Sequence, residues 1–431
     1  MTKTPQMKIS SLDRKIYQNY KEARAKLTLK TGDIFTKYLA IQPKKHLELL
    51  KNIGGQIPQI NPHKTIFVLI PAFYEANFIL QTLEALLPKN SDALRFWNNN
   101  VVVIILNNYC LRKPDTETPQ LVRQFKQKKQ FQDIFVINYS FPNKRSNVGY
   151  CRKILHDLVI LKAEDSDINL ADSIFVSFDA DILEVDLRIF SKAYKVMRGN
   201  AKIDAIQGKM TRLPKGIYRN NLFYIFSAIY DEVRNEWQSR KYRNSGVPKY
   251  NFMWNRIFTY GTGLFLRPSV YCEIGGFDGL SLGEDYAIGS KISFLRATGP
   301  DSFKNSNVNT VRALNYITVN HPRRDLYAFI NGAAVYNKFG LYSHDQKIRK
   351  TGIEWGDTYK KIKREMPLNN SNLLVILRTL LDKSAKRISD PTENMAILNR
   401  AIQKVKNNSK KLPTRTIYRL DSALEKLNHK R

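Results

Sequence analysis

The chain has 431 residues, of which 43% are hydrophobic, and a formal net charge of +32 at pH 7. This composition supports one large or two modest hydrophobic cores. No apolar run approaches the roughly 18 residues of a membrane span, and the first residues carry no hydrophobic signal core. With only three scattered cysteines, we expect a reduced cytoplasmic protein with no transmembrane segment rather than a secreted one.

Both ends of the chain are strongly basic. Residues 360–431 contain 18 Lys and Arg against 6 Asp and Glu, and the first 51 residues are also basic. Such ends are able to bind an anionic membrane surface, which would place the protein peripherally at the inner membrane face. A solvated surface explains the charge equally well. We do not expect nucleic acid as a partner, since no nucleic-acid-binding module is recognisable.

The predicted elements begin with polar helical segments in residues 1–62, which end in a link rich in Gly and Pro. Strands and helices then alternate, with strands at 65–70, 101–106, 134–138 and 174–178 and helices at 78–87, 120–129 and 149–162. This alternation predicts a largely parallel sheet covered by helices, in which ligands bind at the carboxyl ends of the strands. Pro71, Asn107 and Asp179 all fall at that edge.

Two carboxylates, Asp179 and Asp181, follow the fourth of these strands with one residue between them. In an extended chain, residues i and i+2 point to the same face, so these side chains are expected to lie close together. Like charges at that distance favour a bound cation, and a divalent ion with oxygen ligands fits. Taken alone, such a pair is more often a solvated strand end.

The second half of the chain begins with a predicted strand at 205–210 and an aromatic helix at 221–237. A strand with Gly at its head follows at 260–268, and then a Gly-Gly-Phe-Asp turn at 275–278. Glu284 and Asp285 open the next predicted helix. Because the helix dipole favours acidic residues there, simple charge preference is the alternative to a functional pair.

The order of these motifs resembles that of family 2 glycosyltransferases with the A-type fold. The matching segments, within about residues 64–335, are Pro71–Glu75, Val148–Lys153, Asp179–Asp181, Gly275–Asp278 and Glu284–Asp285. The resemblance implies an α/β fold of GT-A type, with a Rossmann-like mixed, mainly parallel sheet flanked by helices. It would form a catalytic domain at 63–340, with a nucleotide-binding half at 63–181 and an acceptor-binding half at 182–340. Basic helical N- and C-terminal extensions are expected at 1–62 and 341–431.

The resemblance also implies a metal-dependent hexosyltransferase. Such an enzyme moves a sugar from a nucleotide-diphosphate donor to a hydroxyl of a glycan, lipid-linked or small-molecule acceptor. In the family the second Asp of the pair, here Asp181, is usually the direct metal ligand, whereas Asp179 contacts the ribose or reaches the metal through water. Mn²⁺ and Mg²⁺ both suit these oxygen ligands. The metal would neutralise the charge that develops on the leaving diphosphate.

Asp285 is expected to be the general base of an inverting transfer, in which it removes a proton from the attacking hydroxyl. Glu284 would orient or bind the acceptor. The Gln-x-x-Arg-Trp motif of processive polysaccharide synthases is missing. A cellulose- or chitin-type synthase is therefore not expected, although polysaccharide biosynthesis in a broader sense fits.

The nucleotide sugar is expected at the end of the first strand and at the motifs beside it. The residues that match the family there are Pro71, Ala72, Phe73, Glu75, Arg152, Lys153, Asp179 and Ala180. Asn107 occupies a position where many members have Asp. Its amide can hydrogen-bond a base edge but lacks the negative charge, which leaves UDP favoured without securing it. For Arg152 and Lys153, a charged helix surface is a nearly equal alternative.

Two further segments are weaker candidates. His321 lies where related enzymes place a metal ligand, although a turn residue before proline is the alternative. An acceptor or diphosphate loop is expected from residues that can pair with phosphate or approach it closely, namely Gly261, Thr262, Gly263, Arg323 and Arg324.

Two other functions compete with the inverting transferase. A retaining transferase, similar to glycosylglycerate synthases, would share the fold and the metal site without Asp285 as base. A catalytically inactive member would act as a scaffold that binds glycans or anionic surfaces.

Overall fold

The computed structural model describes residues 11–109, 114–129, 131–140, 147–211, 259, 261–280, 283–296, 311–320, 390–408 and 414–428, with single helical residues in 229–236 and 374–381. Two compact units divide the chain. The first consists of Met1–Ala180, Asp186–Lys209 and Trp254–Tyr316, and the second of Asp181–Val185, Met210–Met253 and Ile317–Arg431.

Three helices precede the sheet of the first unit: α1 (Ser11–Thr28), α2 (Ile34–Ala40) and α3 (Lys44–Gly54). Asp33 is the N-cap of α2, where its carboxylate accepts hydrogen bonds from the backbone N–H groups of Phe35 and Thr36 at 2.9 and 2.8 Å. Tyr38 and Leu50 of these helices belong to the same buried cluster as the central strands. Helices α2 and α3 are therefore part of the core of the first unit.

Four parallel strands form one half of the sheet: β1 (Ile66–Phe73), β2 (Val101–Tyr109), β3 (Ile134–Ser140) and β4 (Ile174–Ser177). Ile66 pairs with Val101 of β2 on one side and with Ile174 of β4 on the other. β1 and β2 are apolar along nearly their whole length, as is typical of parallel strands that are buried on both faces.

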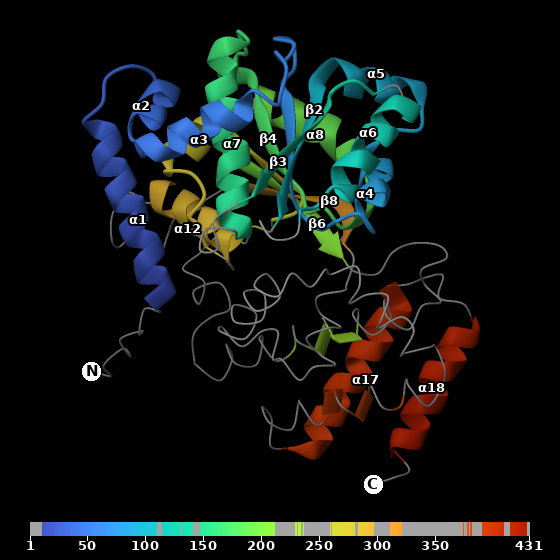
Figure 1. The fold of residues 1–431 in the computed structure, drawn as a ribbon. Coiled ribbons are helices and arrows are strands. Elements are labelled where there is room, and N and C mark those ends of the chain that lie inside the picture. The colour runs from blue at the N-terminus through green and yellow to red at the C-terminus, as the bar shows by residue number, and fades with distance from the viewer. Residues whose placement is uncertain are drawn as a thin grey trace, which may run out of the picture. The chain divides into compact units, whose positions relative to one another are not determined.

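Helices connect these strands and cover the sheet on both sides (Figure 1). One side is covered by α7 (Val148–Asp165), which contacts β1 and β2. The connecting helices of the other side are α4 (Ile79–Leu86), α5 (Ser91–Asn100), α6 (Glu117–Lys129) and α8 (Arg188–Gly199). A short 3₁₀ helix, η1 (Leu170–Asp172), precedes β4.

The other half of the sheet is antiparallel in its described pairings. Its strands are β5 (Ile182–Val185), β6 (Ala205–Thr211), β7 (Leu264–Leu266) and β8 (Val311–Asn320). The order across the sheet is β3-β2-β1-β4-β7-β6-β8-β5. After β7 the chain forms two helices, α11 (Pro268–Glu273) and α12 (Glu284–Arg296). This mixed sheet flanked by helices confirms the predicted fold class.

The second unit includes two helices near the carboxyl end, α17 (Pro391–Asn408) and α18 (Thr414–Asn428). Their buried side chains include Ile397, Ile402 and Leu420. Lys406 of α17 pairs with Asp421 of α18 at 2.7 Å. The predicted helical character of this basic segment is thus confirmed for the two helices.

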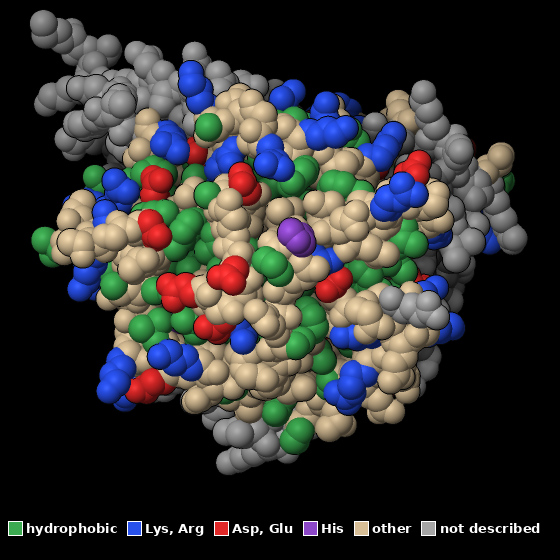
Figure 2. Space-filling model, turned by 90° about the horizontal axis from the view of Figure 1, so that it is seen from above, with side chains coloured by type: hydrophobic (Ala, Val, Ile, Leu, Met, Phe, Trp, Pro, Cys, Tyr) green, Lys and Arg blue, Asp and Glu red, His purple; other side chains and the backbone are tan. Residues whose placement is uncertain are grey.

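The basic charge is not gathered into one patch on the face that Figure 2 shows. Lys and Arg side chains are spread over this face, with Asp and Glu side chains between them. Within the described part of the chain, no helix is both long enough and apolar enough to cross a membrane.

The structure differs from the predicted elements at two places near the candidate site. β4 ends at Ser177, and Ala180 and Asp181 form a turn, so Asp179 and Asp181 do not lie on one extended strand as predicted. The strand predicted at 260–268 is only Leu264–Leu266. Gly263, immediately before this strand, has a φ of +71°, which lies outside the β region. The strand therefore cannot begin before Leu264.

Candidate functional site

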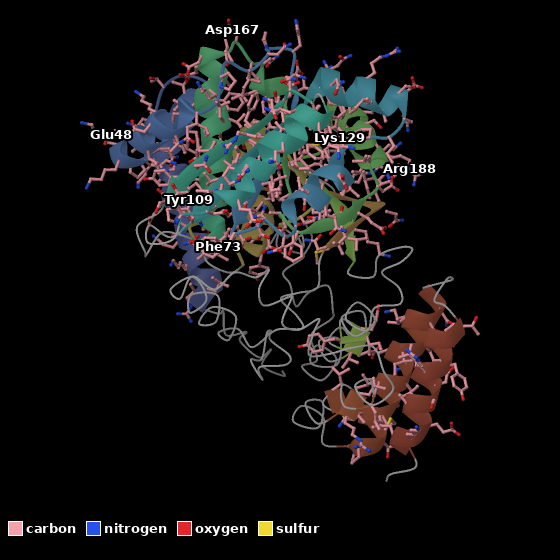
Figure 3. The ribbon with its side chains drawn as sticks, turned by 45° about the vertical axis from the view of Figure 1, so that its right-hand side comes forward. Glu48, Phe73, Tyr109, Lys129, Asp167 and Arg188 are labelled. Carbon is pink, nitrogen blue, oxygen red and sulfur yellow. The ribbon has the colours of Figure 1, made fainter. Side chains whose placement is uncertain are left out.

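The carboxyl ends of β1 and β2 lie at one edge of the sheet. Phe73 and Tyr109, the last residues of these strands, are found at the same end of the first unit, and Asp167 lies at the opposite end (Figure 3). Pro71 and Ala72 pair with Leu106 and Asn107 in register. The predicted nucleotide-binding residues of β1 and β2 are therefore brought together at this edge.

The backbone bends sharply just after β1. Tyr74 has a φ of 52°, a left-handed conformation that is uncommon for a residue with a side chain. The next residue, Glu75, is buried, and its backbone N–H donates to the hydroxyl of Thr118 at 3.1 Å. This contact holds the end of β1 against the start of α6.

The end of β4 is held by hydrogen bonds from two other segments. The backbone N–H of Asp179 donates to the hydroxyl of Thr262 at 3.2 Å. The carbonyl of Ala180 accepts from the hydroxyl of Thr82, on α4, at 2.8 Å. Asp181 follows in the turn and is 4% exposed.

The short loop that contains Gly261, Thr262 and Gly263 lies between β4 and α12. Gly263 donates its backbone N–H to the carbonyl of Ser177 at 2.9 Å. The side-chain amide of Gln207 donates to the carbonyls of Thr262 and Gly263 at 3.0 and 3.2 Å. The sequence motifs do not include Gln207, although a glutamine that follows two apolar residues of a predicted strand is a usable signal.

Arg152 joins two motifs that are far apart in the sequence. It projects from α7, is 1% exposed, and places Nη2 2.6 Å from a carboxylate oxygen of Asp179. Its Nε lies 3.4 Å from a carboxylate oxygen of Glu284 at the start of α12. The remaining terminal nitrogen, Nη1, has no hydrogen-bond partner. The guanidinium of Arg152 is therefore a buried cation that contacts both the carboxylate of Asp179, just after β4, and that of Glu284 on α12.

His156 fixes the position of Arg152 relative to β4. Its Nδ1 donates to the carbonyl of Arg152 at 2.7 Å, because a carbonyl only accepts. Nε2 therefore carries the lone pair and accepts from the hydroxyl of Ser177 at 3.3 Å. Burial lowers the pKa of His156 to about 3, so the ring stays neutral and joins α7 to the last residue of β4.

Glu284 and Asp285 occupy the first turn of α12 as predicted. Asp285 accepts backbone hydrogen bonds from Gly261 at 3.0 Å and from Tyr286 at 2.7 Å. The hydroxyl of Thr259, which was not anticipated, donates to the backbone carbonyl of Asp285. The acidic pair is thus attached to the same loop that holds Asp179.

The pKa values of both acids are raised. Burial raises the pKa of Glu284 to about 7, with a further contribution from Asp285 that Arg152 partly offsets. Burial also raises the pKa of Asp285, although backbone N–H groups and Arg152 oppose the shift. A buried carboxyl group whose pKa is raised is suited to proton transfer.

The Gly-Gly-Phe-Asp turn at 275–278 contacts α12 through Lys291. Gly275 and Gly276 have φ values of +77° and +73°, which only glycine adopts without strain. A carboxylate oxygen of Asp278 lies 2.8 Å from Nζ of Lys291 on α12, a lysine that is 1% exposed. Asp278 therefore helps to hold α12, the helix that begins with Glu284 and Asp285.

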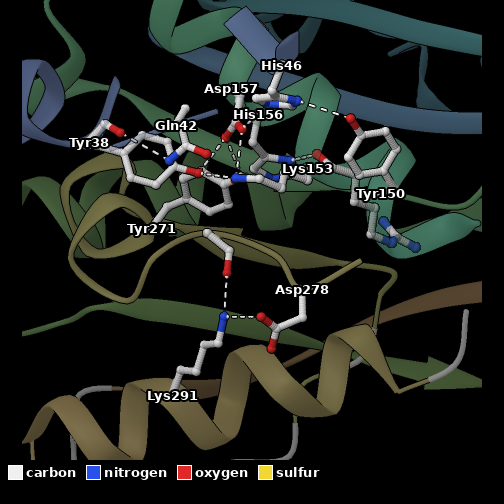
Figure 4. Close-up of polar contacts among 12 residues, drawn as sticks. Tyr38, Gln42, His46, Tyr150, Lys153, His156, Asp157, Tyr271, Asp278 and Lys291 are labelled. Atoms are coloured by element: carbon white, nitrogen blue, oxygen red, sulfur yellow. Dashed lines mark hydrogen bonds and ion pairs between the residues drawn. The ribbon is translucent and has the colours of Figure 1, made fainter. Parts of the chain in front are cut away.

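Lys153 lies in a different environment from its neighbour Arg152. Its ammonium is 2.9 Å from the carboxylate of Asp157 and donates to the hydroxyl of Tyr38 at 2.7 Å. Tyr271 and His46 also donate to Asp157, each at 2.7 Å (Figure 4). Burial raises the pKa of Asp157, but Lys153 and His46 outweigh burial and hold it well below its usual range.

Asp181 and Asp179 are the residues of the predicted metal site that the structure describes. No group of three or more His, Cys, Asp or Glu side chains arranged to hold a metal occurs among the described residues. Carboxylate oxygens are nevertheless suitable donors, because a divalent ion can take its other ligands from substrate phosphates and water. His321, Arg323 and Arg324 lie outside the described residues.

No protein-family model and no curated protein matches the chain. Among solved structures, a mannosyltransferase from Pyrobaculum calidifontis in complex with GDP-mannose and Mn²⁺ is 14% identical, with 93% of this chain and 96% of that chain covered and a TM-score of 0.35. A glucosyl-3-phosphoglycerate synthase from Mycobacterium tuberculosis, with Mn²⁺, UDP-glucose and phosphoglyceric acid, is 15% identical, with coverages of 67% and 80% and a TM-score of 0.30. Likenesses at such low identities and TM-scores assign no function to this chain.

Proposed function

We propose that the chain is a metal-dependent glycosyltransferase. It would move a sugar from a nucleoside-diphosphate donor to a hydroxyl of a glycan, lipid-linked or small-molecule acceptor. The observation that carries this proposal is the position of Arg152 between Asp179 and Glu284, at 2.6 and 3.4 Å. Through it, the carboxylate motif after β4 and the acidic pair of α12, about a hundred residues apart, belong to one buried site.

The donor would bind at the carboxyl edge of β1, β2 and β4, with its base beside β2 and its diphosphate near Asp179 and Asp181. Arg152 already holds one oxygen of Asp179, which favours Asp181 as the direct metal ligand. A bound Mn²⁺ or Mg²⁺ would supply Lewis-acid stabilisation of the leaving diphosphate. The loop of Gly261, Thr262 and Gly263 would lie alongside the sugar and the acceptor.

Asp285 would act as general base in an inverting transfer. Burial raises the pKa of Asp285, which makes its carboxylate a stronger base towards an acceptor hydroxyl. The N–H groups of Gly261 and Tyr286 fix the orientation of its carboxylate. Glu284, held by Arg152, would orient the acceptor and maintain the charge balance of the site.

The test measures release of nucleoside diphosphate from UDP-glucose and from GDP-mannose, with Mn²⁺ and with EDTA. The wild-type protein should release product from at least one donor, only with metal. Asp181→Asn should lose metal-dependent release, and Asp285→Asn should lose release while still binding the nucleoside diphosphate. Asp172→Asn, at an exposed site before β4, serves as the matched control. Full release by both site variants would refute the proposed roles.

A further inference from the structure

Two buried hydrogen-bond acceptors beside the end of β2 have no partner. Oδ1 of Asn107 and Oδ2 of Asp115 each lack a hydrogen bond, although Asn107 is 0% exposed and Asp115 is 7% exposed. Buried polar atoms in folded proteins are nearly always hydrogen-bonded, so two such atoms on residues that are hydrogen-bonded to each other point to a missing ligand.

The two residues are directly connected. Nδ2 of Asn107 donates to the backbone carbonyl of Asp115 and to Oδ1 of Asn138, both at 3.0 Å. Because a carbonyl only accepts, these bonds fix which end of the amide is the NH₂ group. Oδ1 of Asn107 is therefore an acceptor.

The carboxylate of Asp115 is fixed as well. Its Oδ1 accepts the backbone N–H of Thr118 at 3.0 Å, at the start of α6. The neighbouring Asn108 contacts Cys151 on α7, and successive side chains of a strand alternate, so Asn107 faces the side of α6. Asp115 and Asn107 thus form a fixed pair at the carboxyl edge of the sheet.

We infer that this pair recognises a guanine base, so that the donor is a GDP-sugar; this rests on the function proposed above. Two neighbouring acceptors require two neighbouring donors. Guanine supplies them on one edge as N1–H and the exocyclic N2 amine, whereas uracil has a single N–H donor between two carbonyl acceptors. Asp115 and Asn107 would accept from the two guanine donors.

Asp115 supplies the negative charge that Asn107 lacks. Asn107 departs from the Asp of the related enzymes, and the lost charge leaves the preference for uridine insecure. Asp115 restores a carboxylate to the same edge from the start of the next helix. An acceptor left unpaired by a wrong base costs affinity, so a missing donor should weaken binding by roughly 10- to 100-fold.

The decisive experiment is isothermal titration of the full chain with GDP, IDP and UDP in the presence of Mn²⁺. IDP keeps the N1–H donor of GDP but lacks the exocyclic amine. GDP should bind tightest, with IDP and UDP each weaker by about tenfold or more. Equal binding of GDP and IDP, or tighter binding of UDP, would overturn the inference and leave the proposed transferase intact. No binding of any of the three would instead overturn the transferase itself.

Asp115→Asn provides the matched variant. It keeps an oxygen for the N–H of Thr118 and replaces only the unpartnered oxygen by an NH₂ group. GDP binding should weaken by roughly tenfold or more, and UDP binding should change less. Asp172→Asn should alter neither, and circular dichroism should show that both variants are folded. An unchanged GDP affinity in folded Asp115→Asn would contradict the assignment.

Discussion

Gly261 lies directly against the guanidinium of Arg152. A Cβ atom added at Gly261 would stand 2.4 Å from Nη2 of Arg152, the nitrogen that contacts Asp179. The backbone N–H of the same glycine donates to Asp285. One residue without a side chain therefore lets the loop approach the buried cation and hold the proposed base at the same time.

Gly261→Ala is expected to disturb the site more than the fold. The new methyl group must displace Arg152 or the loop, because two carboxylates hold the guanidinium in place. We expect at least a tenfold loss of donor turnover and a loss of about 1–3 kcal/mol in the free energy of unfolding. Gly199→Ala, where an added Cβ meets nothing within 4 Å, should leave both unchanged or slightly raise stability. Equal turnover in the two variants would show that the loop position is unimportant.

Arg152→Met should be strongly destabilising. It leaves Asp179 and the buried Glu284 without the cation they share, and breaking a buried pair in this way costs about 3–5 kcal/mol. Arg152→Lys retains the charge and should cost less, although a single ammonium cannot reproduce both contacts. Chemical denaturation of the three proteins measures the difference. Comparable stability of the Met variant and wild type would mean that the ion pairs of Arg152 with Asp179 and Glu284 do not stabilise the folded state.

Glu284 should make stability fall as pH rises towards neutrality. Its pKa is raised from 4.5 to about 7 in the folded chain, so between these values the native state holds a proton that the unfolded state releases. The contribution is present below pH 4.5 and is lost as pH rises through about 7, a change on the order of 3 kcal/mol. Glu284→Gln has no such proton, so its stability relative to wild type should increase over this range. Denaturation from pH 4.5 to 8 with EDTA present tests this, and parallel curves for the two proteins would contradict it.

Much of the fold could be predicted because its signals are local. Apolar runs such as Val101–Leu106 and helical spacing identify the parallel half of the sheet, and the motif order indicates the site at its carboxyl edge. The predicted nucleotide-binding residues do meet there, as the register of Ala72 with Asn107 shows.

The rest depends on contacts between distant segments, which periodicity does not encode. Arg152 and Lys153 are adjacent on one helix, yet Arg152 contacts Asp179 and Glu284, whereas Lys153 contacts Asp157. Asp115 was not predicted, because a lone Asp before a helix is typical of a simple N-terminal cap. Only the structure reveals that its second carboxylate oxygen, Oδ2, has no hydrogen-bond partner. Helices α2 and α3, read as part of an extension, are in the core because their apolar residues pack on α7 and the sheet.

Asp157→Asn should loosen the N-terminal helices. The carboxylate accepts from Tyr38 of α2, His46 of α3, Tyr271 and Lys153, and it joins these segments at one buried point. An amide cannot accept all four bonds and leaves Lys153 without its counter-charge, so we expect a loss of about 3–5 kcal/mol. Tyr38→Phe removes one bond and should cost about 1 kcal/mol.

The pH dependence of this contribution follows from the lowered pKa of Asp157. Stability from the network is present above the ordinary pKa of an aspartate and is lost as pH falls through the lower folded value. Hydrogen exchange at α2 and α3 should therefore accelerate in Asp157→Asn at pH 7, and in wild type only under strong acid. Exchange in α6, on the other side of the sheet, is the internal control. If α2 and α3 exchange at the wild-type rate in the Asn variant, Asp157 does not hold these helices, and their apolar residues alone account for the packing.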